Sequence, residues 1–130
     1  MPNTDLQERL IDYAVRIIRL SVALPETLAG KHIAGQILRS GTSAAPNYAE
    51  AVSSESRKDF IHKLQIALKE LRETDVWLKV IQRAEILKAA SSLLPLQNET
   101  NELTAILIAS VHTARRNTKQ TTPKQSPNNK

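Results

Sequence analysis

The stretch RSGTSAAPNYAEA (Arg39–Ala51) decides the fold, because it could be a loop or part of a helix. Its Gly, Ser, Thr and Pro content is typical of a loop or linker. Its apolar residues nevertheless continue the helical spacing of the residues before it. The residues that share this side of the helical wheel are Ile33, Ala34, Ile37, Leu38, Gly41, Ala44, Ala45, Tyr48, Ala49 and Val52. We therefore predict one helix from Leu28 or Ala29 to about Val52, kinked near Pro46, since proline lacks a backbone donor and disfavours helical geometry in the residue before it.

Three more amphipathic helices surround this one in the chain. The first helix has a main apolar stripe. The third begins near Ser56, capped by Ser56 with Asp59 in its first turn, and the fourth begins between Ala89 and Pro95. Their stripes are Leu6, Leu10, Tyr13, Ile17, Leu20 and Leu24; Phe60, Leu64, Ala67, Leu71, Thr74, Leu78 and Ile81; and Leu96, Leu103, Leu107 and Ala114. The pattern predicts an all-α fold, an antiparallel up-down-up-down four-helix bundle over residues 1–116.

Two apolar features exceed what one bundle core needs. The first helix carries a second stripe, and the end of the third helix is apolar all round its axis. The residues concerned are Ile11, Ala14, Ile18 and Val22 in the stripe, and Val76, Trp77, Leu78, Val80 and Ile81 in the helix end. We expect the fourth helix and its connection, or another subunit, to cover that end.

The net charge of +5 lies at the carboxyl end of the 130-residue chain. From Arg115 onward there are five basic residues and no acidic ones, so the body up to Ala114 is formally neutral. Residues 117–130 are rich in Asn, Gln, Thr, Pro and Lys and predict a disordered basic tail. Such a tail either adds salt-sensitive affinity for phosphates or simply keeps the protein in solution.

The absence of cysteine, of a signal peptide and of any long apolar run leads us to expect a cytoplasmic protein without disulfides and without contact with a membrane. The best match to a di-metal carboxylate pair is Asp59 with His62, and both His32 and His112 have alanine three residues earlier. There is also no nucleophile elbow or phosphate-binding loop. We therefore predict no enzyme activity, no catalytic residues, no metal and no cofactor.

Short basic clusters are the candidate contacts for nucleic acid: Arg57, Lys58, Lys63, Arg115, Arg116 and Lys119. Because the four aromatic residues fall on or beside apolar stripes, stacking on bases is not expected. The alternative is an ordinary solvated surface with ion pairs such as Lys69 with Glu73.

A second candidate set is a polar row on the second helix. It consists of Arg39, Ser43, Asn47 and Glu50, with Trp77 of the third helix as a further interface candidate. These side chains either hydrogen-bond across an interface or face water, and we favour the interface because a solvated face more often carries Lys and Glu. On the other side, Gly41, Ala44 and Ala45 allow a neighbouring helix to approach closely.

The order and spacing of VRIIRLSVALP, RSGTSAAPNYAEA and RKDFIHKLQIALKELRETDVWL resemble a bacterial family, the four-helix-bundle proteins encoded in intervening sequences of 23S rRNA genes. The likeness covers about residues 6–117, and Pro46 departs from the commonest form of the motif. The resemblance implies a ring-like homo-oligomer, commonly a pentamer, without assigned catalytic residues. Relatives include accessory proteins of diversity-generating retroelements, which implies RNA or DNA and a reverse transcriptase as partners.

Two hypotheses follow. The first is a non-enzymatic homo-oligomer that binds RNA or a nucleoprotein partner through basic side chains at the helix ends and the tail. The second is a structural assembly or protein-interaction module without a nucleic-acid ligand.

Overall fold

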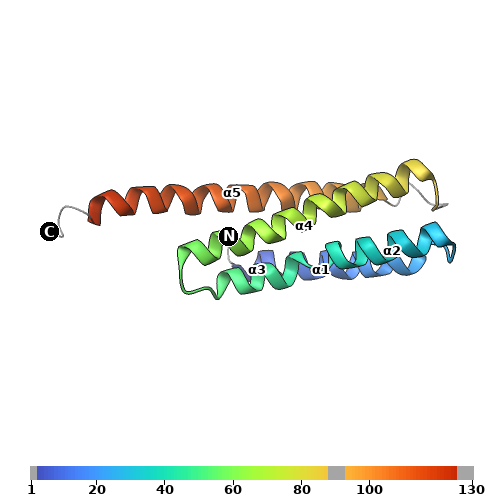
Figure 1. The fold of residues 1–130 in the computed structure, drawn as a ribbon, viewed down its shortest axis with the longest axis horizontal. Helices are drawn as coiled ribbons and strands as arrows, with labels where there is room; N and C mark the ends of the chain where they lie inside the picture. The colour runs from blue at the N-terminus through green and yellow to red at the C-terminus, as the bar shows by residue number, and fades with distance from the viewer. Residues whose placement is uncertain (1–2, 88–92, 126–130) are drawn as a thin grey trace.

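The computed structural model describes residues 3–87 and 93–125, with side chains for residues 5–87 and 93–117. This part of the chain is helical and contains no strand. Its helices are α1 (Asn3–Ala23), α2 (Leu28–Gly41), α3 (Ala44–Val52), α4 (Arg57–Ala84) and α5 (Leu93–Gln125). Figure 1 shows α2 and α3 following each other along one edge, so that the five helices form a four-membered bundle in which successive members run in opposite directions.

The predicted second helix is two helices, α2 and α3, separated by Thr42 and Ser43. Pro46 lies in the first turn of α3, where its missing N–H leaves the carbonyl of Thr42 without the usual helical donor. Hydroxyl groups occupy the end of α2: Thr42 Oγ1 donates to the Leu38 carbonyl at 2.6 Å and Ser43 Oγ to the Arg39 carbonyl at 2.6 Å. The expected kink is therefore a break one turn before the proline.

The other helix boundaries follow from capping. Thr27 accepts a hydrogen bond from the Gly30 amide at 3.0 Å at the start of α2. Ser56 accepts one from the Asp59 amide at 3.1 Å at the start of α4, as the sequence predicts. Helix α5 begins at Leu93, within the predicted range.

Helix α5 extends past the other helices at the end where α3 meets α4 (Figure 1). It continues to Gln125, beyond the expected end of the bundle at residue 116. No glycine interrupts this segment, and helix-compatible Lys and Gln residues occur along it, while Pro123 lies near its end. The predicted disorder of residues 117–130 remains a prediction, and residues 126–130 lie outside the described part of the chain.

The core follows the predicted stripes on all members of the bundle. Two hydroxyl pairs lie within it: Tyr13 Oη with Thr100 Oγ1 at 2.6 Å, and Ser40 Oγ with Thr74 Oγ1 at 2.8 Å. Burial raises the pKa of the Tyr13 phenol, and the bond to Thr100 only partly offsets this. These pairs satisfy the polar groups that the apolar stripes carry into the core.

Gly41 allows α1 and α2 to approach closely, as expected. A Cβ atom at this position would lie 2.6 Å from Cγ2 of Ile17, which is itself fully buried. Only a residue without a side chain fits there.

Candidate interaction surfaces

The predicted nucleic-acid contacts gather at one end of the bundle. Arg57 and Lys58 are exposed in the first turn of α4, and Arg115 and Arg116 are exposed on α5. Arg57 lines the same cavity as α5 residues 113, 114 and 117, so the two pairs lie at the same end of the bundle. We call Arg57, Lys58, Arg115 and Arg116 the basic end. The side chain of Lys119 lies outside the described residues.

Lys63 is the exception among the described cations of this set. Its Nζ lies 2.6 Å from Oε1 of Glu50 on α3, so its charge is paired within the chain. The four residues of the basic end make no ion pair with any described side chain. The basic end therefore carries four cations without a described ion-pair partner, and the exposed acids Glu55 and Asp59 flank Arg57 and Lys58 in the sequence.

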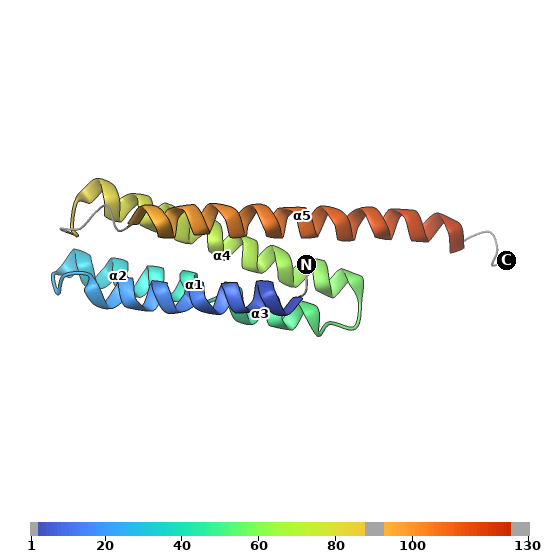
Figure 2. The same ribbon diagram turned by 180° about the vertical axis from the view of Figure 1, so that it is seen from behind.

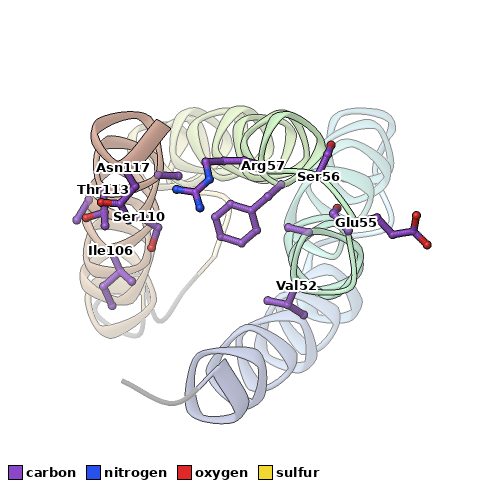
Figure 3. A pocket seen from close by; sticks show the side chains of 13 residues that line it. Val52, Glu55, Ser56, Arg57, Ile106, Ser110, Thr113 and Asn117 are labelled. Carbon is purple, nitrogen blue, oxygen red and sulfur yellow. The ribbon is translucent and has the colours of Figure 1, made fainter. Parts of the chain in front are cut away.

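An open cavity of about 760 Å³ lies between α3, α4 and α5 at the basic end. Figure 3 shows Val52 directed into it, Arg57 reaching across from α4 toward α5, and Glu55 directed away. Phe60 also lines the cavity and is only half-buried, although its stripe predicts a core position. Sequence periodicity cannot predict the partial exposure of Phe60. That exposure depends on whether α1 closes the cavity, and no described residue of α1 does so.

The polar row lies along the contact between α2–α3 and α4. Arg39 bridges Glu70, with Nη1 3.2 Å from Oε1, and Glu73. Trp77 donates its indole N–H to Glu73 at 3.1 Å, and its ring meets His32 edge-on with 6.1 Å between centroids. Glu73 therefore binds Arg39, and the expected ion pair with Lys69 is not formed.

The rest of the row is divided between its own helix and α4. Asn47 donates to the Ser43 carbonyl at 2.9 Å, Ser43 donates to the Arg39 carbonyl of α2, and Glu50 binds Lys63 of α4. The ends of the row thus contact another helix of the same chain. The predicted role of the row in an interface between chains remains a prediction.

The second stripe of α1 is exposed at Ile11, Ile18 and Val22, whereas its fourth member, Ala14, is half-buried. Val15 is exposed beside them, and the exposed fractions are 40% for Ile11, 37% for Val15, 44% for Ile18 and 77% for Val22. Adjacent exposed apolar residues at helical spacing are unusual on a helix that faces only water. We call these four residues the α1 ridge.

The apolar end of α4 is covered only in part. Leu78 and Ile81 are buried and Trp77 is half-buried, but Val76 and Val80 are 56% and 37% exposed. The sequence leads us to expect the fourth helix and its connection, or another subunit, to cover this end, and coverage by another subunit stays a prediction.

In residues 3–87 and 93–125, no three His, Asp or Glu side chains form a group that could hold a metal ion. Within the same ranges, no helix is long and apolar enough to cross a membrane.

Comparison with known proteins identifies the family. The family model of the 23S rRNA-intervening sequence protein matches residues 3–109. A crystal structure of a protein of unknown function from Bacteroides thetaiotaomicron VPI-5482, described as a member of the S23 ribosomal protein family, is 36% identical in sequence with a TM-score of 0.79. That match covers 86% of this chain and 99% of the other. A search of curated proteins finds no match. The chain belongs to the 23S rRNA-intervening sequence protein family.

Proposed function

We propose that this protein is a non-enzymatic, homo-oligomeric bundle of the bacterial cytoplasm that binds RNA or a nucleoprotein partner. The main support for self-assembly is the α1 ridge, which exposes four large apolar side chains in one line. Burying such a ridge between copies removes apolar surface from water, at about 25 cal/mol for each Å². A ring, with a pentamer as the favoured size, is the assembly that the family resemblance implies.

The basic end supports the binding of nucleic acid. Its four cations have no described ion-pair partner, and the amino terminus of α4 adds the partial positive charge of the helix dipole. Cations and backbone amides in this arrangement contact phosphates rather than base edges, so binding should be strong in low salt and weakly specific in sequence. RNA is the preferred ligand, DNA is the alternative nucleic acid, and a reverse transcriptase is the nucleoprotein partner that the resemblance implies.

A gel-shift titration of structured RNA at increasing salt tests the binding. In Arg57→Ala/Arg116→Ala, affinity should fall, and the slope of log K against log salt should decrease by about 0.7–0.9 for each phosphate that no longer meets a cation. The matched control is Lys31→Ala/Arg83→Ala, which removes two exposed cations at the opposite end of the bundle. Absence of salt-sensitive binding at micromolar protein would reject the nucleic-acid part of the proposal.

The structural alternative is favoured by the neutral charge of the body and by the exposed apolar side chains of α1 and α4. It predicts an assembly without affinity for nucleic acid. Light scattering on the wild type and on Ile18→Glu, with Asn98→Glu as the surface control, measures the assembly separately. A wild-type monomer would reject both readings.

A further inference from the structure

We propose that the outer face of α1 in one copy packs against the outer face of α4 in the next copy. This inference rests on the self-assembly part of the proposed function and names the two surfaces that meet. It does not depend on nucleic acid.

The two faces have complementary chemistry. On α1, the exposed acids Glu8 and Asp12 and the exposed base Arg19 lie beside the ridge. On α4, the exposed Val76 and Val80 follow the exposed bases Lys69 and Arg72. Glu8, Asp12, Lys69 and Arg72 make no hydrogen bond or ion pair with described residues of their own chain. Each face therefore offers an apolar segment to the other, and the two acids of α1 are opposite in sign to the two bases of α4.

The order of charged and apolar residues also matches along the bundle. Ile17 lies against Gly41 and the neighbouring Ser40 bonds to Thr74, which places Ile17 and Thr74 at about the same height. Asp12 and Lys69 each come five residues before these markers. Val22 and Val80 come five and six residues after them. Two copies placed side by side without sliding thus bring Asp12 to the level of Lys69 and Val22 to about the level of Val80.

The proposed contact joins two different faces of the bundle. Figures 1 and 2 show α1 and α4 running in the same direction, and Figure 3 shows them on opposite sides of the bundle, separated by α5 and by α2–α3. A contact between two different faces is heterologous, and it generates a ring when the rotation between copies closes. Rotation about an axis along the bundle keeps all helices in the same direction, so α1 and α4 of adjacent copies meet in parallel.

Cysteine cross-linking tests this pairing without interference, because the chain contains no cysteine. In Ile18→Cys/Val76→Cys, a short bifunctional maleimide should produce a ladder of covalent oligomers on a denaturing gel. Each single variant should stay monomeric on the same gel. The matched control is Ile18→Cys/Asn98→Cys, which moves the second thiol to an exposed site on α5.

The outcomes separate this inference from the proposed function. Covalent dimers from Ile18→Cys alone would show that α1 meets α1 and would overturn the pairing. Assembly by light scattering without the expected ladder would overturn it as well, while self-assembly would stand. A monomer would reject both.

Charge reversal provides an independent measurement. Asp12→Lys should weaken self-association by about tenfold, because it places like charges together at the contact. Adding Lys69→Asp in the same chain should restore most of the affinity, because every contact then contains the exchanged pair. Lys31→Asp, an exposed charge reversal on α2, should change nothing. Failure of the second reversal to restore association would contradict the proposed contact.

Discussion

The middle of the bundle and its basic end differ in how completely they are filled. In the middle, apolar stripes interlock and the Tyr13–Thr100 and Ser40–Thr74 pairs satisfy their hydroxyls, and no buried side-chain polar atom among the described residues lacks a partner. At the basic end, a cavity of about 760 Å³ remains open and Phe60 is only half-buried. The packed middle of the bundle therefore determines stability, whereas residues of the basic end can be substituted with little effect on folding.

The largest expected effect is the loss of a large side chain from the filled section. Leu71→Ala should lower the free energy of unfolding by about 2–5 kcal/mol, because Leu71 is fully buried and its removal leaves a cavity. Phe60→Ala on the same helix should lower it by about 1 kcal/mol, because Phe60 already borders open space. Urea unfolding of the two variants measures both values. Equal losses would show that the two regions are filled to the same degree.

The next effect concerns the close approach at Gly41. Gly41→Ala should destabilise by about 1–3 kcal/mol, since the added methyl group meets Ile17. Gly35→Ala is the matched control on the same helix: nothing lies within 4 Å of its Cβ position, so it should stabilise by about 0.4–1 kcal/mol. Opposite signs in thermal unfolding would confirm that α1 touches α2 at Gly41. A stabilising Gly41→Ala would disprove it.

A smaller effect, on the pH dependence of stability, is expected at Tyr13 in the packed middle of the bundle. Its pKa is raised in the folded state by burial, so its contribution to stability is complete below the unfolded pKa of about 10 and is lost as the pH rises toward the folded value. Tyr13→Phe should lose about 1 kcal/mol at neutral pH with its hydrogen bond. Above pH 10 its melting temperature should fall less steeply than that of the wild type. Parallel profiles would exclude this role of Tyr13.

The smallest expected effect is at the polar row. Arg39→Ala removes the bridge to Glu70 and Glu73, but the Arg39 side chain is 51% exposed, so the loss should be at most about 1 kcal/mol. The difference from the wild type should shrink in high salt, which urea unfolding at two salt concentrations can measure. A changed assembly mass in this variant would instead place the row in an interface between copies.

The periodicity of the sequence predicts the bundle and most of its core, because each stripe from α1 to α5 faces inward where the spacing requires. It also predicts the Ser56 cap and the contact at Gly41, because both depend on neighbours along one helix or on the size of a single residue. The break between α2 and α3 is displaced from the expected kink, because the carbonyl that proline leaves unsatisfied belongs to a residue one turn earlier.

The surfaces are harder to predict because they depend on helix lengths and on distant partners. The cavity is lined by residues of α3, α4 and α5, and no described α1 residue closes it, which no local pattern encodes. The partner of Glu73 is Arg39 rather than the nearby Lys69, because a bundle brings residues of two helices as close as helical neighbours. The sequence places the basic residues correctly on their helices but does not reveal that Lys63 is already neutralised.

The break at Thr42–Ser43 leaves the phase of the apolar repeat unchanged. Buried positions run through both helices at steps of four or three: Ile33, Ile37, Gly41, Ala44, Tyr48 and Ala51. Because the break keeps the phase of the repeat, it requires no compensating insertion elsewhere and no repacking against α1 or α4. Pro46→Ala should therefore leave the same side chains of α2 and α3 in the core.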